Sequence, residues 1–387
     1  MIKTRYVEKF QQLETPFYFY DLDLLRKTLE TIRIESEIYG YKVHYAVKAN
    51  ANDAVLETIS SYGFGADCVS GNEILRVIEK GVPNHKIAFA GVGKTDREIR
   101  IALENDIFSF NCESIPEIEV INEIAAEMGK IAPVAIRINP DVDPQTHEYI
   151  TTGLKDNKFG INHWDFKAVG RTLKALSNIR LTGIHFHVGS QITDISVFEE
   201  LSLKVNKVQE WFEENGFTLD HINVGGGLGI NYENPEKEPI PDFASYFKAF
   251  NDNLCMREGQ QLHFELGRSV VAQCGHLISK VLYLKQGLET KFLILDAGMT
   301  ELIRPALYKA VHAVSNLTSS LPAEKYDIVG PICESSDTFG KGMMVARAQR
   351  GDIIAIHSAG AYGETMASTY NMRDLVKAYN SDQLGSI

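Results

Sequence analysis

Short runs of β-branched and aromatic residues recur along the first 270 residues of the chain, and each is followed by a stretch in which apolar positions have helical spacing. The segment Ser70–Lys80 shows this spacing, because its apolar side chains share one helical face. A second helix is predicted over Ser114–Met128, since Ser114 and Glu117 match the pattern of a capping box. The runs predicted as strands are Val43–Val47, Gly65–Asp67, Ile87–Ala90, Ile107–Phe110, Pro133–Ile138, Thr182–Val188, His221–Val224 and Leu262–Glu265.

These eight strand–helix units in succession are the number that a closed (β/α)8 barrel requires. A doubly wound sheet is the alternative, but its first strand should lead into a Gly-x-Gly-x-x-Gly loop. The first predicted strand leads into Lys48-Ala49-Asn50 instead. The pattern therefore favours an α/β fold with a (β/α)8 TIM barrel over residues 25–270.

After residue 270 the pattern changes to strands bounded by turn residues, with little helical spacing between them. Val281–Leu284, Phe292–Asp296 and Asp352–Ile356 predict an antiparallel β domain over residues 271–387. Thr15–Tyr20 is an isolated strand ahead of the barrel, and we expect it to join this second sheet. Residues 1–24 are accordingly expected to form an N-terminal segment that packs on the β domain.

Composition narrows the class of protein. The chain of 387 residues carries 39 Lys and Arg against 51 Asp and Glu, a formal charge of -12, which argues against binding to nucleic acid phosphates. No segment approaches the roughly 18 apolar residues of a membrane span, so no membrane partner is expected. The five cysteines are scattered without a Cys-x-x-Cys pair, so we expect reduced thiols and a cytoplasmic protein.

In a barrel of this kind, the chemistry takes place where the strands end and the βα loops begin. Polar residues and glycines occupy several of these positions in the predicted strands. They are Lys48, Asp67, Arg137, His185, His187, Gly225, Gly226, Gly227, Glu265 and Arg268. We therefore expect these residues to gather at one end of the barrel.

Three of these features each have a functional and a structural interpretation. Lys48 follows an apolar run, so its amine could form an imine with a carbonyl compound, or its side chain could simply snorkel to water. The loop Gly225–Gly229 could wrap an anion such as a phosphate, or form only a tight turn. Glu265 could keep a pyridine nitrogen protonated, or pair with an internal cation.

His185 and His187 point to one side of a strand, because side chains two residues apart share a face. They could bind a pair of metal ions bridged by a carbamylated Lys48, as in amidohydrolase-type barrels, but that arrangement requires further histidines at later strand ends. His221 and His263 lie at strand starts. No metal site is therefore predicted, and an imidazole stacked on a flat cofactor ring suits His187 better.

Several motifs, in order along the chain, resemble the fold-type III decarboxylases that depend on pyridoxal phosphate (PLP). The motifs that carry the resemblance are Tyr45-Ala46-Val47-Lys48-Ala49-Asn50, His187-Val188-Gly189-Ser190-Gln191, Gly225-Gly226-Gly227-Leu228-Gly229, Glu265-Leu266-Gly267-Arg268, Asp296-Ala297-Gly298-Met299, Arg304-Pro305-Ala306-Leu307-Tyr308, Gly330-Pro331-Ile332-Cys333-Glu334-Ser335 and Gly360-Ala361-Tyr362-Gly363. Together they cover nearly the whole chain. One departure is Leu266, where the family usually has proline; because proline contributes no polar chemistry, the roles of its neighbours should be unchanged.

The resemblance implies an amino acid decarboxylase with pyridoxal 5'-phosphate as its cofactor, and it implies roles residue by residue. Lys48 would carry the cofactor as an imine, His187 would stack on its ring, and Glu265 would face the ring nitrogen. The positions that match cofactor contacts are Lys48, Asp67, Arg137, His187, Ser190, Gly225, Gly226, Gly227, Glu265, Gly267, Arg268 and Tyr362. Those that match substrate contacts are Arg268, Arg304, Tyr308, Glu334 and Tyr362.

Cys333 matches the family's acid, which returns a proton to the substrate carbon after CO2 has left. The resemblance also implies that Cys333 and Glu334 come from the partner subunit, so that the active enzyme is a homodimer with shared sites. A PLP-binding homologue without activity would need neither Lys48 nor Cys333, and both are present.

The charge pattern of the matching substrate positions narrows the substrate. Arg304 and Tyr308, four residues apart at a Pro-initiated helix start, would share one face and could donate with Arg268 to a distal carboxylate. Glu334 could accept an ammonium group. This pattern favours decarboxylation of meso-2,6-diaminopimelate to L-lysine and CO2, the last step of lysine biosynthesis. Carboxynorspermidine remains the alternative substrate, and a metal-dependent barrel hydrolase is the less favoured alternative.

Overall fold

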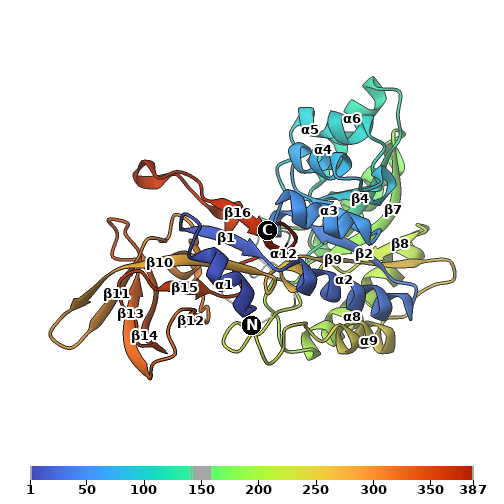
Figure 1. The fold of residues 1–387 in the computed structure, drawn as a ribbon. Coiled ribbons are helices and arrows are strands. Elements are labelled where there is room, and N and C mark those ends of the chain that lie inside the picture. The colour runs from blue at the N-terminus through green and yellow to red at the C-terminus, as the bar shows by residue number, and fades with distance from the viewer. Residues whose placement is uncertain (1, 141, 143–157, 386–387) are drawn as a thin grey trace. The chain divides into compact units, whose positions relative to one another are not determined.

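The computed structural model describes residues 2–140, 142 and 158–385. The chain forms two compact units. The colours of Figure 1 follow the residue numbers, so the segments that contribute to each unit can be located there. The barrel unit comprises residues 29–229 and 242–267, and the β unit comprises residues 1–28, 230–241 and 268–387. The short segment 230–241 therefore belongs to the β unit, although the sequence pattern places it within the expected barrel range.

The barrel unit contains a closed barrel of parallel strands in sequence order, with the last strand paired to the first. Its strands are β2 (Lys42–Ala46), β3 (Gly65–Cys68), β4 (Ile87–Phe89), β5 (Ser109–Cys112), β6 (Ala132–Ile138), β7 (Ile179–Phe186), β8 (His221–Asn223) and β9 (Gln261–Leu266). Each predicted strand overlaps one of these, so the barrel prediction is confirmed. Strand β5, the fourth of the barrel, lies two residues later than expected, because Asn111 continues it and has its amide bonded inside the barrel.

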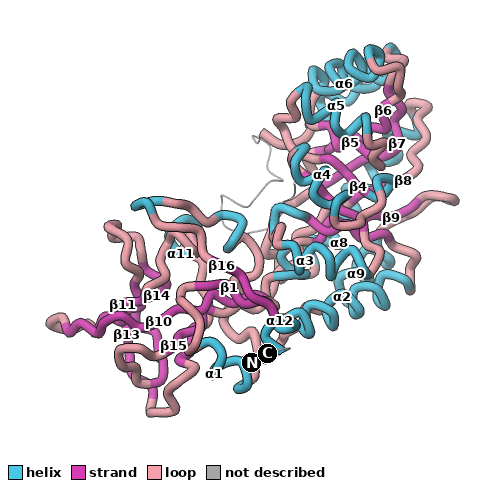
Figure 2. Tube along the Cα trace, turned by 45° about the horizontal axis from the view of Figure 1, so that its top comes forward, coloured by secondary structure: helices cyan, strands magenta, loops and turns pink. Residues whose placement is uncertain are grey.

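Helices surround this barrel on the outside, as Figure 2 shows. They are α2 (Leu22–Glu37), which begins in the β unit, α3 (Asp53–Ser61), α4 (Gly71–Glu79), α5 (Asp96–Glu104), α6 (Ile115–Glu127), α7 (Phe166–Ala175), α8 (Ser196–Glu214) and α9 (Phe243–Asn253). Ser114 caps α6 by accepting from the Glu117 N–H at 3.3 Å. The predicted capping box is nevertheless incomplete, because the Glu117 carboxylate accepts from the Glu113 N–H at 2.6 Å and pairs with Lys94 at 2.5 Å.

Three histidines fill the barrel near the strand starts, the end opposite to Lys48. His44 Nε2 lies 2.8 Å from His263 Nδ1, and the ring of His221 lies 5.1 Å from that of His263. Burial lowers the pKa of His221 to about 3, so this imidazole is neutral at physiological pH. Gly183 makes room for it, since a Cβ there would lie 2.6 Å from the His221 ring nitrogen.

The β unit is built on one large sheet. Its strands are β1 (Phe17–Tyr20), β10 (Gly275–Gln286), β11 (Lys291–Leu295), β12 (Val314–Asn316), β13 (Ala323–Val329), β14 (Thr338–Ala346), β15 (Ile353–Ile356) and β16 (Lys377–Asn380). The main path runs β12-β15-β10-β11-β13-β14, and β1 pairs with β10 and β16. The expected N-terminal strand is therefore part of this sheet. The predicted antiparallel pairing holds except between β1 and β16 and between β11 and β13, which are parallel.

An aromatic cluster anchors the N-terminal segment to this sheet. The helices of the β unit are α1 (Thr4–Phe10), α10 (Arg268–Val271), α11 (Arg304–Tyr308) and α12 (Ser381–Gly385). Phe10 of α1 and Phe19 of β1 are fully buried, with ring centroids 5.0 Å apart. Lys9 also donates to the Leu384 carbonyl, which joins α1 to α12.

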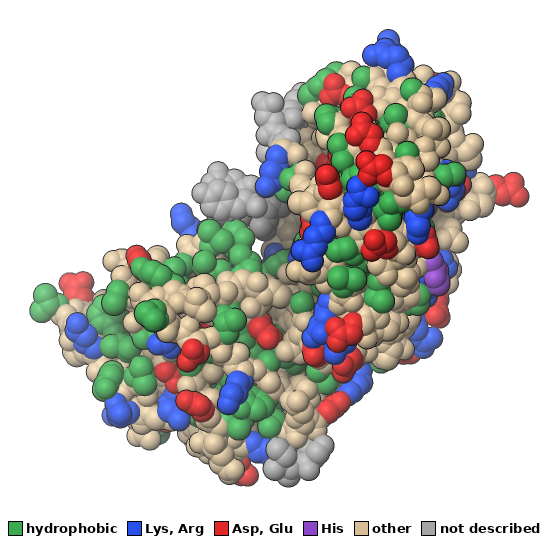
Figure 3. Space-filling model, turned by 90° about the horizontal axis from the view of Figure 1, so that it is seen from above, with side chains coloured by type: hydrophobic (Ala, Val, Ile, Leu, Met, Phe, Trp, Pro, Cys, Tyr) green, Lys and Arg blue, Asp and Glu red, His purple; other side chains and the backbone are tan. Residues whose placement is uncertain are grey.

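The surface carries interspersed charges on the face drawn in Figure 3, where basic side chains do not gather into a patch. Within residues 2–140 and 158–385, no helix is both long enough and apolar enough to cross a bilayer.

Candidate functional site

Lys48 and Asp67 form an ion pair at the carboxyl ends of β2 and β3. Lys48 lies in a turn of 3-10 helix (Val47–Ala49), and its Nζ is 2.8 Å from Asp67 Oδ2. Burial raises the pKa of the fully buried Asp67, the nearby Glu265 charge raises it further, and the Lys48 ammonium opposes both. Within the described part of the chain, the other carboxylate oxygen of Asp67 has no hydrogen-bond partner. The structure thus brings two predicted residues together, and Asp67 Oδ1 can still accept a further hydrogen bond.

Glu265 is a buried carboxylate at the end of β9. Its Oε2 is 2.9 Å from His185 Nε2, so His185 is a hydrogen-bonding partner of this carboxylate. Its Oε1 accepts from the side-chain amides of Asn111 at 3.0 Å and Asn223 at 2.7 Å. Burial alone would raise the pKa of Glu265, but His185 and Lys48 together outweigh it and hold the pKa below its usual range. Glu265 is therefore ionised inside the barrel.

Asn111 and Asn223 are functional candidates that the sequence analysis missed. Both are polar residues at the carboxyl end of a strand, β5 and β8 respectively. The rule that identified Glu265 and Arg137 would have found them as well.

The glycine loop follows β8 and fits closely against two neighbouring strands. Gly225 and Gly227 have φ angles of +69° and +107°, in the region that favours glycine. A Cβ on Gly226 would lie 2.0 Å from the Glu265 carbonyl oxygen, and one on Gly225 would lie 2.4 Å from that of Phe186. Side chains are therefore excluded along this loop, which leaves its backbone free to approach an anion closely.

His187 and Arg137 lie at the ends of neighbouring strands. His187 directly follows β7, and burial, with the charges of Arg137 and Lys48, lowers its pKa well below the usual value. Its imidazole is therefore neutral. The Arg137 guanidinium forms a buried ion pair, with its Nη1 2.8 Å from Glu113 Oε1. Glu113 was not among the predicted residues, and it compensates the Arg137 charge.

Two more of the predicted residues, Ser190 and Gly267, lie in the barrel unit. Ser190 lies in the loop after β7. Gly267 follows β9, and a Cβ there would lie 3.1 Å from that of Ala46 and 3.2 Å from that of Ala49. The absence of a side chain at Gly267 thus lets the chain pass close to the segment that carries Lys48.

A second group of predicted residues lies in the β unit. Arg268, the first residue of α10, donates from Nη1 to the Tyr232 hydroxyl at 2.6 Å, and its Cζ is 5.0 Å from the Tyr362 ring centre. Arg304, the first residue of α11, has its Nη1 2.9 Å from His312 Nε2. Both guanidinium groups are buried.

Aromatic rings surround these guanidiniums. The Arg304 Cζ lies 4.7 Å from the centre of the Tyr232 ring, which thus contacts both arginines. Tyr308 ends the helix that Arg304 begins, as the sequence predicted. Tyr232 and His312 were missed, because nothing in their local sequence distinguishes them from ordinary loop residues.

Cys333 and Glu334 are exposed in the loop between β13 and β14. The base of this loop is fixed by Asp337, whose carboxylate accepts from the backbone N–H of Met299 at 2.6 Å and of Ile332 at 2.7 Å. Glu334 accepts from the Tyr370 hydroxyl at 2.7 Å. The loop therefore presents a thiol and a carboxylate to solvent from a fixed base.

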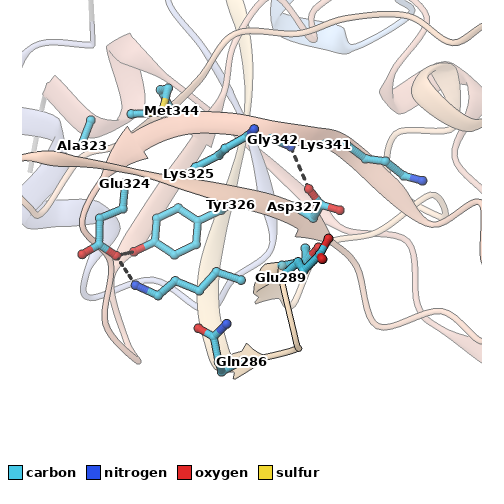
Figure 4. Close-up of a pocket in the computed structure, with 12 residues that line it drawn as sticks. Gln286, Glu289, Ala323, Glu324, Lys325, Tyr326, Asp327, Lys341, Gly342 and Met344 are labelled. Carbon is cyan, nitrogen blue, oxygen red and sulfur yellow. Dashed lines mark hydrogen bonds and ion pairs between the residues drawn. The ribbon is translucent and has the colours of Figure 1, made fainter.

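A separate groove on the β sheet, drawn in Figure 4, has a volume of about 810 Å³ but contains none of the predicted site residues. Its Glu324 carboxylate binds Lys291 and the Tyr326 hydroxyl, and its Asp327 accepts from the Gly342 N–H. None of the groove residues belongs to the set gathered at the barrel end.

The donor set at the barrel end fits PLP. An aldehyde requires an amine, which Lys48 supplies, and a phosphate requires a close backbone, which Gly225–Gly227 offers. A pyridine nitrogen that is to stay protonated requires an ionised carboxylate, which is the state of Glu265. The neutral ring of His187 is suited to lie against a flat heterocycle.

Comparisons with known proteins agree with this fit. The family model described as pyridoxal-dependent decarboxylase, pyridoxal binding domain, matches residues 25–272. The diaminopimelate decarboxylase of Bacteroides thetaiotaomicron is 57% identical over 379 residues, which cover 98% of this chain and 98% of that protein. That of Aquifex aeolicus is 40% identical over 368 residues, which cover 95% of this chain and 86% of that protein. Among solved structures, Helicobacter pylori diaminopimelate decarboxylase complexed with L-lysine aligns with a TM-score of 0.90 at 39% identity, over 97% of this chain and 94% of that one.

Proposed function

The chain belongs to the pyridoxal-dependent decarboxylase family, and from this membership we propose how its residues divide the work of the reaction. The enzyme decarboxylates meso-diaminopimelate to L-lysine and CO2, as the sequence predicted, and the alternatives of carboxynorspermidine and metal-dependent hydrolysis are not favoured. All five cysteines are free thiols, which supports the proposed cytoplasmic location.

When bound, PLP supplies an electron sink for the charge that remains on the substrate carbon after CO2 leaves. In our proposal Lys48 holds its aldehyde carbon, and Asp67 keeps the amine in position. Gly225–Gly227 and Ser190 hold the phosphate. Glu265, kept ionised by His185, holds the proton on the ring nitrogen. The positions Arg137, His187, Gly267, Arg268 and Tyr362 complete the proposed cofactor contacts.

The single observation that best supports a diacid substrate is the state of Arg304. The residue is 4% exposed, its guanidinium bonds to His312, and among the described residues no carboxylate pairs with it. A buried cation without a counter-ion is costly unless a ligand provides the opposite charge. The distal carboxylate of diaminopimelate, which decarboxylation leaves in place, is proposed to supply that charge, with Arg268 and Tyr308 as further donors and Glu334 and Tyr362 as further contacts.

The direct test is a substrate panel with the PLP-loaded enzyme. We expect CO2 and L-lysine from meso-diaminopimelate, and much slower CO2 release from carboxynorspermidine and ornithine. Faster turnover of either of those compounds would overturn the substrate assignment.

Arg304→Ala should chiefly impair binding of the diacid. Removing one partner of a buried charge pair costs about 2–5 kcal/mol, so kcat/KM for meso-diaminopimelate should fall by on the order of 10²-fold or more. The loss should appear mainly in KM. Arg347→Ala is a suitable control, because that side chain is exposed in the same unit and only weakly paired, 3.7 Å from Glu324. An unchanged KM in Arg304→Ala would contradict the assigned role.

Cys333 and Glu334 are proposed to complete the active site of a second copy of the chain. Their exposure on a loop with a fixed base supports this role, because a partner subunit can reach them. Cys333 is the proposed acid that delivers a proton to the substrate carbon, and Glu334 the proposed contact for the distal ammonium. The functional enzyme is accordingly proposed to be a homodimer with shared sites.

Co-expression of two inactive variants tests the shared sites. Lys48→Ala and Cys333→Ala each remove one contribution from every site of their own homodimer. In a hybrid dimer one site carries both changes and the other carries neither. Because half of the dimers should be hybrids, activity should recover to about one quarter of that of the unmodified enzyme. If co-expression gives no more activity than the two variants expressed separately, each chain supplies its own Cys333.

A further inference from the structure

We propose that His312 is a positioning residue that adapts Arg304 to bind a carboxylate. His312 holds the Arg304 guanidinium through an uncharged lone pair, so the orientation of the guanidinium is fixed while its positive charge stays available to the ligand. This inference rests on the proposed function of Arg304, and it adds a residue that determines specificity.

The hydrogen bonds of His312 fix which of its nitrogens carries the proton. His312 Nδ1 lies 2.8 Å from the His357 carbonyl oxygen. A carbonyl can only accept, so Nδ1 carries the hydrogen and donates it. In the neutral ring Nε2 then has a lone pair, which accepts from Arg304 Nη1 at 2.9 Å. A guanidinium can only donate, so this arrangement requires a neutral imidazole.

The surroundings keep His312 neutral. Its side chain is fully buried, and burial, followed by the charge of Arg304, lowers its pKa to about 3. The other groups that act on its pKa are the His357 carbonyl, which raises it, and Arg268 and His357, which lower it. Across the physiological pH range, His312 therefore remains an acceptor towards Arg304.

The register of the sheet places His312. It lies two residues before β12, and β12 pairs with β15 so that Val314 lies opposite Ile356. The His357 N–H donates to the Ala313 carbonyl at 2.8 Å, and the Ala313 N–H donates to the Tyr232 carbonyl at 3.2 Å. The two backbone bonds of the adjacent Ala313 thus tie this segment to β15 and to Tyr232, and the centroids of the His312 and Tyr232 rings are 5.1 Å apart.

Two other buried cations among the described residues have a carboxylate partner. Arg137 is paired with Glu113 at 2.8 Å, and Lys94 with Glu117 at 2.5 Å. Arg304 is just as deeply buried, but its bonded partner is an imidazole and its nearest ring is a phenol. A carboxylate at position 312 would neutralise Arg304 and compete with the substrate for it. The neutral acceptor avoids that competition.

An isosteric pair of variants separates the charge of the acceptor from its shape. His312→Gln keeps a neutral acceptor, and His312→Glu puts a negative charge in nearly the same volume. His312→Leu removes the acceptor. Calorimetry on each PLP-loaded protein would measure the Kd of L-lysine, which carries a carboxylate, and of cadaverine, which is the same diamine without it.

We expect His312→Gln to bind L-lysine within about threefold of the unmodified enzyme, and His312→Glu to bind it roughly 30-fold more weakly or worse. The affinity for cadaverine should be the same in all variants, which a merely structural role for His312 would not produce. If His312→Glu fails to fold, the comparison of His312→Leu with His312→Gln decides in the same way, with weaker L-lysine binding expected for leucine.

Two results would overturn the inference. One is L-lysine affinity that does not change between Gln, Glu and Leu, and the other is a parallel loss of both ligands. The proposed function of Arg304 fails in a different way, namely if the unmodified enzyme binds L-lysine no more tightly than cadaverine.

Discussion

Replacing Lys48 with alanine should abolish decarboxylation, lowering kcat by on the order of 10⁴-fold or more, as the loss of a covalent catalytic group generally does. Lys48 is the proposed amine for the cofactor aldehyde. It is also the ion-pair partner of the fully buried Asp67, at 2.8 Å. The measurement is CO2 release together with the visible absorbance of protein-bound PLP, and both should be lost.

Lys48→Arg separates the two roles of this side chain. Arginine keeps a positive charge for Asp67, but its guanidinium stays protonated and cannot act as a nucleophile. We therefore expect Lys48→Arg to be as inactive as Lys48→Ala while being more stable towards urea. Lys80→Ala, which removes a lysine paired with the exposed carboxylates of Asp53 and Glu57 on α3, should leave activity unchanged. Near-normal turnover by Lys48→Arg would refute the covalent role.

The barrel could be predicted because each strand–helix unit is encoded locally. A buried parallel strand is a short apolar run, and the following helix shows its own periodicity, so neither depends on distant sequence. The β unit was less predictable. Strand β13 has only two buried positions, Tyr326 and Ile328, and the parallel pairing of β11 with β13 depends on which segments meet in three dimensions.

The same contrast applies to the candidate site. Lys48, Asp67 and Glu265 were found because a strand end in a barrel has a known place, and the structure brings them together. Asn111 and Asn223 satisfy the same criterion and were overlooked.

Tyr232 and His312 belong to a different class. They meet Arg304 through sheet register and through a segment, 230–241, that leaves the barrel unit to join the β unit. No local pattern encodes that meeting.

Cys333→Ala should slow turnover more than it weakens binding. Loss of a general acid typically costs about 10²–10⁴-fold in rate, and the thiol carries no charge that substrate binding requires. We therefore expect kcat for meso-diaminopimelate to fall by roughly that factor. KM should change little. Cys255→Ala is a matched control, because Cys255 is the other exposed thiol and lies in the barrel unit.

Product analysis in D2O distinguishes an acid from a group that only shapes the site. A proton delivered from a fixed thiol reaches one face of the substrate carbon, so the unmodified enzyme should give L-lysine with deuterium in a single configuration. In Cys333→Ala the proton would come from water, and the label should be distributed over both configurations. A variant that is slow but still places deuterium on one face would show that another group donates the proton, and that Cys333 contributes only to packing around the substrate.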